Sequence, residues 1–348
     1  MTDTAKIIAI ATAVPKYKIH QNDIEALSTK LFGDSFEDFA RLAPIYKNAA
    51  IETRYSCVPI EWYTQPSSFS ERNRLYQDNA VELLAEAAQK ALDYANMTFD
   101  DIDGLVVVSS SGIATPSLDA LLMEKLQLKR NMERLPIFGL GCVGGVVGLA
   151  RTAQLACGAP EKRYLYMVVE LCGLDFINSE HTKSNVIATA LFADGASAAV
   201  ISCKGDGPEI IGCGEHTWPD SLSVMGWDVT DKGLSVIFSK DIPSIVRKDM
   251  RKIVDDFLNI HRVDKNDIME FLCHPGGAKV LDAIQEALNI KPNQLRHARD
   301  VLRNYGNMSA ATVMFVLEAG LNNAKSGHYL MSSFGPGFTA GLVLLQVR

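Results

Sequence analysis

The sequence predicts an α/β protein made of two similar halves, each with layers of strands and helices. In each half, a helical pattern leads through an acidic turn to a short apolar run. Residues 82–95 precede the run 105–108, and residues 253–260 precede the run 268–272. Such runs are typical of strands buried in parallel sheets. A repeated order of elements therefore favours a duplication.

A second correspondence supports the duplication. Gly141-Cys142 opens the helical pattern 143–157, and Gly306-Asn307 opens the pattern 308–319. Each half then closes with two strand-like runs, at 164–170 and 196–202, and at 329–333 and 339–346. Alternating strands and helices predict mostly parallel sheets covered on both faces. The Gly- and Pro-containing segment 204–208 predicts the junction, so we expect halves at 1–204 and 205–348. Two unrelated α/β domains would give the same pattern.

Composition narrows the functional class. The net charge of −7, without a basic run, argues against nucleic-acid binding, and 47% hydrophobic residues are typical of a soluble globular protein. Seven cysteines without a CxxC pair or a metal-ligand spacing predict a reduced, cytoplasmic protein without a bound metal. The run 7–14 imitates a signal peptide, but Pro15 closes it and we expect a first strand. No run approaches the ~20 apolar residues of a membrane span.

Cys142 is the most informative residue, because it stands between a predicted strand and a small-residue helix. Unpaired N–H groups and the positive end of a helix dipole favour thiolate over thiol, and the thiolate is the nucleophile. The alternative is a cysteine packed between elements, since free cysteine is often buried. This segment alone leaves both open.

His274 and Asn307 are the expected partners of this cysteine. His274 follows the strand at 268–272, and Asn307 precedes a helix. Each is more often structural, as a strand-end side chain or a helix cap. Together, however, a thiolate, an imidazole and an amide can bind a thioester and stabilise its oxyanion. Because no base for activating water is evident, the combination favours decarboxylative carbon–carbon bond formation over hydrolysis.

Five motifs in order resemble the type III polyketide synthases, the chalcone-synthase-like branch of the thiolase superfamily. They are Gly141-Cys142-Val143-Gly144-Gly145, Leu191-Phe192-Ala193-Asp194-Gly195-Ala196, His274-Pro275-Gly276-Gly277, Tyr305-Gly306-Asn307-Met308-Ser309 and Phe334-Gly335-Pro336-Gly337, with a further match at Arg54-Tyr55. The resemblance runs from residue 5 to the C-terminus. It implies a thiolase-like layered αβαβα fold of two duplicated halves, and a homodimer.

The resemblance also implies roles for single residues. Cys142 would carry the starter acyl group, while His274 and Asn307 would position the malonyl thioester and stabilise its enolate. Phe192 matches a gatekeeper between the reaction chamber and the coenzyme A tunnel, with core packing as the alternative. Three consecutive residues, Gly335, Pro336 and Gly337, match the loop that borders the cyclisation cavity. Ser309 matches a supporting residue beside the asparagine.

Departures from the plant enzymes bear on the substrate. Val236 falls where a second aromatic gatekeeper is expected, and Thr115 replaces a methionine that reaches into the neighbouring subunit. Cys172 and Ala188 are small residues near positions that shape the cavity. These small side chains predict a long aliphatic starter in place of a cinnamoyl-type ring, as in the bacterial alkylpyrone and alkylresorcinol synthases.

Coenzyme A carries phosphates, so an acidic protein needs local positive charge to hold it. The resemblance loosely assigns this role to Arg41, Lys47 and Lys279; ordinary solvated charges are the alternative.

We therefore expect an acyltransferase that takes acyl- and malonyl-coenzyme A, needs no cofactor beyond these thioesters, and closes its product to a pyrone or a phenol. One rival is a ketoacyl synthase of the type III kind, which condenses once with a carrier-bound substrate. Its histidine is followed by a glutamine-containing turn in place of Pro275-Gly276-Gly277. The other rival is a catalytically silent scaffold relative. The presence of Cys142, His274 and Asn307 weakens it.

Overall fold

The computed structural model describes residues 3–33 and 36–348. Its strands are β1 (Lys6–Ala13), β2 (Tyr17–His20), β3 (Thr53–Ser56), β4 (Gly104–Val108), β5 (Glu133–Ile137), β6 (Arg163–Leu171), β7 (Asp194–Ser202), β8 (Glu209–Thr217), β9 (Met225–Thr230), β10 (Gly233–Phe238), β11 (Ile268–Cys273), β12 (Gly327–Gly335) and β13 (Thr339–Val347). Its helices are α1 (Gln21–Phe32), α2 (Phe39–Leu42), α3 (Pro44–Asn48), α4 (Phe69–Ala95), α5 (Leu118–Lys125), α6 (Gly144–Gly158), α7 (Lys183–Leu191), α8 (Ile242–His261), α9 (Ala278–Leu288), α10 (Arg296–Tyr305) and α11 (Ser309–Leu321).

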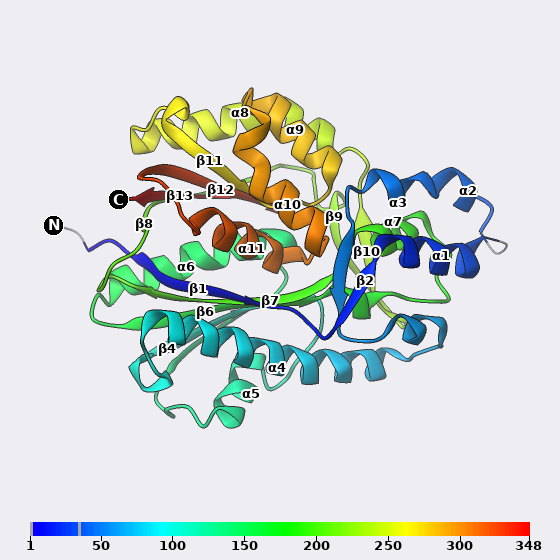
Figure 1. Ribbon diagram of the computed structural model, residues 1–348, viewed down its shortest axis with the longest axis horizontal. Coiled ribbons are helices and arrows are strands. Elements are labelled where there is room, and N and C mark those ends of the chain that lie inside the picture. Colours follow the sequence, from blue (N-terminus) through cyan, green and yellow to red (C-terminus); the bar gives the residue numbers. More distant parts are fainter. Residues whose placement is uncertain (1–2, 34–35) are drawn as a thin grey trace.

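The main sheet shows the duplication. Its strand order is β11-β12-β13-β8-β1-β7-β6-β4-β5, so β11-β12-β13-β8 from the second half mirrors β4-β6-β7-β1 from the first. The two arms meet through one residue pair, Lys6 with Glu209. Figure 1 shows α6 and α11 between the arms, α8 and α9 outside one arm, and α4 and α5 outside the other. This arrangement confirms the predicted layered αβαβα fold.

The expectation of mostly parallel strands is wrong. Among the described residues, β4 runs parallel to β5 and β6, and β11 runs parallel to β12. The other neighbouring pairs of the main sheet are antiparallel. The connections between consecutive strands explain why these pairs are antiparallel. β12 returns directly into β13 through a short loop, and β7 re-enters the sheet beside β6 after α7, whereas a parallel neighbour needs a full crossover.

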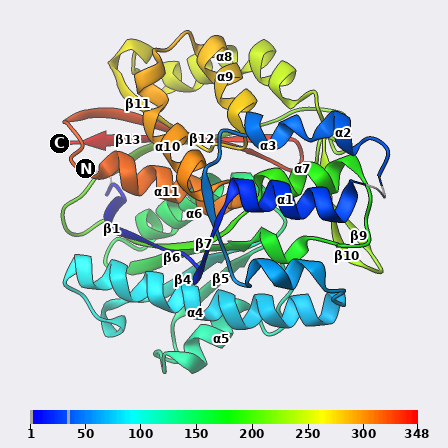
Figure 2. The same ribbon diagram turned by 45° about the vertical axis from the view of Figure 1, so that its right-hand side comes forward.

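Small residues allow the two central helices to pack closely. A Cβ atom on Gly145 of α6 would overlap the carbonyl oxygen of Ala310 in α11, so a larger residue would push the helices apart. Gly148 is similarly close to the side chains of Val108 and Tyr166. The glycine-rich start of α6 is therefore a packing requirement, and it brings the first turns of α6 and α11 together. Figure 2 shows both helices enclosed by the sheet.

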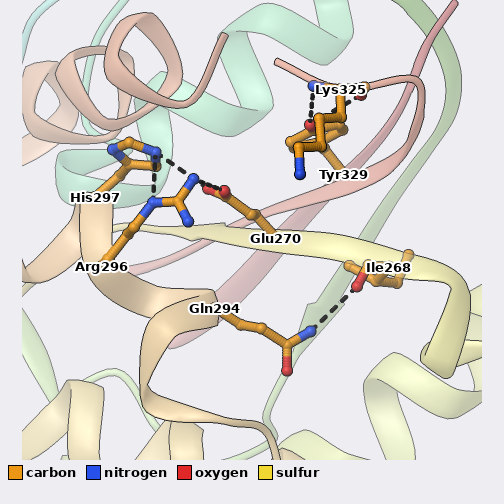
Figure 3. A network of polar contacts seen from close by, with 7 residues as sticks. All are labelled: Ile268, Glu270, Gln294, Arg296, His297, Lys325 and Tyr329. Atoms are coloured by element: carbon orange, nitrogen blue, oxygen red, sulfur yellow. Dashed lines mark hydrogen bonds and ion pairs between the residues drawn. The ribbon is translucent and has the colours of Figure 1, made fainter. Parts of the chain in front are cut away.

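A polar network anchors α10, the helix that leads to Asn307. Figure 3 shows Glu270 of strand β11 bound by Arg296 at the start of α10, with the His297 ring nitrogen Nε2 3.3 Å from its second oxygen. Nearby, Gln294 donates a hydrogen bond to the carbonyl of Ile268 at 3.1 Å. The beginning of α10 is thus fixed to the edge strand, which fixes the direction in which its other end enters the site.

Candidate active site

Cys142 lies on a single 3-10 turn, Gly141–Val143, that leads directly into α6. Gly141 has φ +50°, a left-handed conformation that favours glycine. The Cys142 sulfur is 3.4 Å from the Ser309 hydroxyl, and its carbonyl accepts a 2.6 Å hydrogen bond from Ser333. Burial raises the pKa of the thiol to about 12. Cys142 thus lies at a helix start, as predicted, and its burial favours the thiol, against the effect of the helix terminus.

His274 follows β11 and is held through its backbone. Its N–H donates to the carbonyl of Ser332 at 2.7 Å. Both ring nitrogens are buried and lack a hydrogen-bond partner among the described residues. Burial lowers the pKa of the imidazole to about 3, so the ring is neutral at physiological pH. An unpartnered neutral imidazole can both donate and accept a hydrogen bond, which suits a group that binds substrate.

Asn307 lies between α10 and α11, where its backbone forms an isolated β-bridge with Phe192. Its amide N–H donates to the carbonyl of Leu191 at 2.9 Å, and its carbonyl accepts from Ala193 at 2.9 Å. Its side-chain nitrogen Nδ2 donates to the carbonyl of Gly276 at 3.2 Å, while its oxygen Oδ1 accepts from the Ser309 N–H at 2.9 Å. These bonds fix the amide orientation and leave its second N–H available.

A continuous chain of contacts joins the three predicted residues. Cys142 touches Ser309, the N–H of Ser309 bonds Asn307, and Asn307 bonds the carbonyl of Gly276. A Cβ atom at Gly276 would lie 3.6 Å from His274 Nε2, so this carbonyl belongs to the turn beside the ring. Adjacent serines of β12 bind the backbones of His274 and Cys142. The structure therefore brings Cys142, His274 and Asn307 into one region.

Cys142 opens into a small chamber, and a larger apolar cavity lies behind it. Cys142, Ser309 and Pro336 line the chamber, together with residues of the β9–β10 hairpin. The second space, which we call the inner cavity, extends beneath α1 and is lined by apolar residues such as Ile24 and Leu27. Four residues line both spaces: Cys172, Phe192, Trp227 and Val236. These four side chains form the gate between the chamber and the inner cavity.

Phe192, Val236 and Cys172 line the gate, and Ala188 lines the inner cavity alone. The role of Phe192 at a coenzyme A tunnel stays a prediction. Trp227 was not predicted. It is the cross-strand partner of Val236, and its ring centre lies 6.2 Å from that of Phe192. The aromatic side chain that is absent at position 236 is thus supplied by the neighbouring strand.

Arg54 holds the segment that carries Phe192. Its guanidinium donates to the carbonyls of Thr189 at 2.9 Å, Ala190 at 2.7 Å and Phe192 at 2.6 Å. These carbonyls stand at the C-terminal end of α7, where helical carbonyls lack partners within the helix. Arg54 therefore fixes the gate residue and, through the Leu191 and Ala193 backbone bonds, Asn307.

The Gly335, Pro336 and Gly337 loop packs against the Cys142 turn, since a Cβ atom on Gly141 would lie 2.7 Å from Pro336. Pro336 lines the chamber. A Cβ atom on Gly335 would overlap the carbonyl oxygen of Leu140, and Gly337 has φ +128°. Both glycines are therefore required by the backbone, and the loop closes one side of the chamber.

The remaining predicted residues lie away from these two spaces. Arg41 is exposed on α2 and pairs with Asp38 at 2.9 Å. Lys47 is exposed on α3, and Lys279 is exposed in the first turn of α9. Thr115 is exposed in the loop between β4 and α5. None of the four lines the chamber or the inner cavity, and the coenzyme A role of the cations stays a prediction.

Glu170, near the end of β6, is a buried acid that was not predicted. Its oxygen Oε2 accepts from the Ser110 N–H at 3.0 Å, while Oε1 has no partner among the described residues. Burial raises its pKa to about 7, and its charge opposes ionisation of Cys142. A charged residue within the apolar run 164–171 was the signal in the sequence.

The Glu170 pKa predicts a pH-dependent contribution to stability. Because the folded-state pKa is about 7 and the ordinary value is near 4.5, the contribution is fully present below pH 4.5 and lost as pH rises through 7. The unfolding free energy of the native protein relative to Glu170→Gln should fall by about 3 kcal/mol over this range. Urea unfolding of both proteins at several pH values measures it. A difference independent of pH would contradict the assignment.

The described residues contain no group of three His, Cys, Asp or Glu side chains that could hold a metal ion. Over the same residues, no helix is both long and apolar enough to cross a membrane.

The two halves match known sequence families. Residues 2–205 match the N-terminal domain of chalcone and stilbene synthases, and residues 210–347 match the C-terminal domain. The chain belongs to the chalcone and stilbene synthase family. Within it, a putative chalcone synthase of Bacillus subtilis is 37% identical over 359 residues, covering 98% of each chain. The 1,3,6,8-tetrahydroxynaphthalene synthase of Streptomyces peucetius subsp. caesius is 35% identical, covering 98% of this chain and 92% of the relative.

Solved structures agree with this family assignment. A 1,3,6,8-tetrahydroxynaphthalene synthase from Streptomyces coelicolor, described as a bacterial type III polyketide synthase, matches with a TM-score of 0.94 and 25% identity over 99% of both chains. The type III polyketide synthase domain of Steely1 from Dictyostelium matches with a TM-score of 0.92 and 26% identity, again over 99% of both. This chalcone and stilbene synthase family member is therefore a decarboxylating, condensing acyltransferase of the type III polyketide synthase group.

Proposed function

We propose that the protein loads an acyl-coenzyme A starter onto Cys142, extends it with malonyl-coenzyme A, and closes the chain to a pyrone or phenolic ring. The observation that carries the proposal is the chain of contacts that links Cys142, through Ser309, to Asn307 and the turn after His274. This chain lies beside a chamber that contains Cys142 and opens through the gate into an apolar cavity. Relatives named for tetrahydroxynaphthalene support a phenolic product.

Loading begins with the buried thiol. Because the pKa values of Cys142 and His274 lie far apart in the empty site, their resting state is thiol and neutral imidazole. The imidazole accepts the thiol proton as sulfur attacks the starter thioester. Coenzyme A leaves as a thiol after taking that proton, and the acyl group remains on Cys142. The gate directs the acyl chain toward the inner cavity.

Extension follows with malonyl-coenzyme A. As its carboxylate leaves as carbon dioxide, the bond electrons pass to the thioester, and the enolate oxygen accepts hydrogen bonds from His274 and Asn307. The enolate carbon then attacks the acyl carbon on Cys142, forming the new carbon–carbon bond and releasing the sulfur. Preorganised donors in a buried site stabilise such an oxyanion well. The β-ketoacyl-coenzyme A product can reload Cys142 for another cycle.

The starter is proposed to be aliphatic. Apolar side chains, among them Ile19, Ile24, Leu27 and Leu234, line the inner cavity beneath α1. An alkyl chain gains from leaving water for such a cavity, at about 0.8 kcal/mol for each buried CH₂. Arg41, Lys47 and Lys279 remain the proposed contacts of the coenzyme A phosphates.

A homodimer in the cytoplasm completes the proposal. The outer edge of β5 is unpaired in the main sheet, and Phe138 beside it is 61% exposed. Ile113 is 43% exposed in the loop that contains Thr115, and all three residues line one groove. An unpaired edge beside apolar side chains favours pairing with a second copy of the chain. All seven cysteines are free, as expected for a reducing compartment.

Turnover of a starter panel tests the proposal. With malonyl-coenzyme A, hexanoyl- and dodecanoyl-coenzyme A should give larger kcat/KM values than p-coumaroyl-coenzyme A, with products identified by mass spectrometry. Val236→Phe should reduce dodecanoyl turnover at least about tenfold by narrowing the gate. Val229→Phe, an exposed position on the same hairpin, is the matched control. Faster use of p-coumaroyl-coenzyme A would overturn the aliphatic starter, and dependence on carrier-bound malonate would favour a ketoacyl synthase.

A further inference from the structure

Asp175 is an acid at the inner cavity that the proposed chemistry does not use. It ends the 3-10 turn Cys172–Asp175, directly after β6. Asp175 lines the inner cavity together with apolar residues such as Leu27 and Phe176. Its carboxyl oxygen Oδ2 is shielded from solvent and has no hydrogen-bond partner among the described residues. A buried polar atom without a partner costs about 1–3 kcal/mol, so it calls for an explanation.

Among the described residues, none of the groups around Asp175 donates a hydrogen bond to its oxygen Oδ2. Arg72 is the cation whose charge acts on it, but its guanidinium donates to the backbone carbonyls of Ser67, at 2.8 Å, and Lys232. Asp194, another buried acid that acts on Asp175, differs clearly. Its two oxygens accept from the N–H groups of Cys57 at 2.9 Å and Gly173 at 2.7 Å. Asp194 thus holds the backbone together, whereas Asp175 leaves an oxygen unused.

The surroundings favour the uncharged form of Asp175. Burial raises the pKa of its carboxyl far above the usual range, and the nearby Glu170 raises it further, against the opposing charge of Arg72. A protonated carboxyl has an O–H group that can donate a hydrogen bond. A protonated Asp175 therefore adds a directional donor to a lining whose exposed surface is mostly apolar.

We propose that Asp175 is a specificity-determining residue that donates a hydrogen bond to a ketone or hydroxyl oxygen of the acyl chain in the inner cavity. The inference rests on the proposed function and deepens it, because it names the substrate class. The chain that fits best is aliphatic but carries an oxygen along its length. A plain alkyl chain would leave the carboxyl unpaired, which disfavours it relative to an oxygenated chain.

Such an oxygen has two sources. A starter can bring its own hydroxyl group, or the ketones can arise during extension, one with each malonyl unit. In the first case Asp175 selects the starter. In the second, it retains the growing chain and sets how many extensions precede ring closure. The chemistry at the carboxyl is the same, so the experiment needs one arm for each source.

Two variants provide the test. Asp175→Leu removes the donor and keeps a comparable size, while Asp175→Asn keeps a neutral donor and is the matched control. In the starter arm, kcat/KM is compared for dodecanoyl- and hydroxydodecanoyl-coenzyme A isomers. In the extension arm, mass spectrometry counts the malonyl units incorporated from dodecanoyl-coenzyme A. Asp175→Leu should lower the preference for a hydroxylated starter, or the share of products with the most extensions, about three- to tenfold. Asp175→Asn should remain close to the native protein.

Thermal unfolding separates this role from a structural one. Because Asp175→Leu replaces an unpaired buried carboxyl with an apolar group, its melting temperature should equal or exceed that of the native protein. An active Asp175→Leu protein with unchanged starter preference and unchanged extension number would overturn the inference. A large fall in melting temperature would do the same, by assigning Asp175 a structural role. Absence of product from the native protein with every starter would instead contradict the proposed function itself.

Discussion

Replacing Cys142 by alanine should abolish polyketide formation, with a fall of about three orders of magnitude or more. The sulfur is the atom on which both the starter and the growing chain are expected to reside, and no other cysteine lines the chamber except Cys172 in the gate. Cys142→Ser should be nearly as inactive, because a hydroxyl is a far weaker nucleophile than a thiolate. Intact-protein mass spectrometry after incubation with the starter should show a thioester-linked acyl adduct on the native protein and on neither Cys142 variant.

Cys157→Ser is the matched control, because Cys157 belongs to the same helix, α6, and is exposed near its far end. That variant should keep full activity and the same acyl adduct. Product formation by Cys142→Ala at a rate near that of the native protein would remove the covalent mechanism.

Replacing Asn307 by leucine should reduce malonyl-coenzyme A decarboxylation about 10²- to 10³-fold, the usual effect of losing one oxyanion donor. Acylation of Cys142 should largely survive, because loading depends on the thiol and His274. Loss of decarboxylation with retained loading is therefore the expected signature. Stopped-flow mass spectrometry of the acyl-enzyme, together with carbon dioxide release, measures the two steps separately.

The controls for Asn307 address folding. Its side chain bonds Gly276 and Ser309, so the leucine variant loses two structural hydrogen bonds. Its melting temperature and its acyl-enzyme yield show whether the chamber is still formed. Asn293→Leu, at an exposed position in the turn before α10, should change neither step. Decarboxylation that persists in a folded Asn307→Leu protein would exclude the amide as an oxyanion donor.

Local patterns were sufficient to predict four helical segments, at 82–95, 143–157, 253–260 and 308–319, most strands of the main sheet and the duplicated order. Strand direction was not predictable from them, because apolar runs look the same in parallel and antiparallel sheets when both faces are buried. The β9–β10 hairpin was also not predicted, because its residues are half exposed. Its contribution to the site is the pairing of Val236 with Trp227. Only the register of the two strands brings Trp227 to the gate.

The charge states of the site were less accessible from sequence. The sequence placed Cys142 before a helix, but sequence position does not reveal how completely the sulfur is buried. Burial dominates in the structure and sets the pKa values of both Cys142 and His274. Asp175 became visible only when the fold placed its carboxyl at the inner cavity.

The serine pair of β12 has a consequence for protein synthesis. Ser333 follows Cys142 by 191 residues in the chain, yet Ser332 and Ser333 fasten the backbones of His274 and Cys142. A nascent chain on the ribosome therefore exposes its thiol long before the groups that would use malonate exist. Until β12 has been synthesised, the backbones of His274 and Cys142 lack the two bonds that hold them.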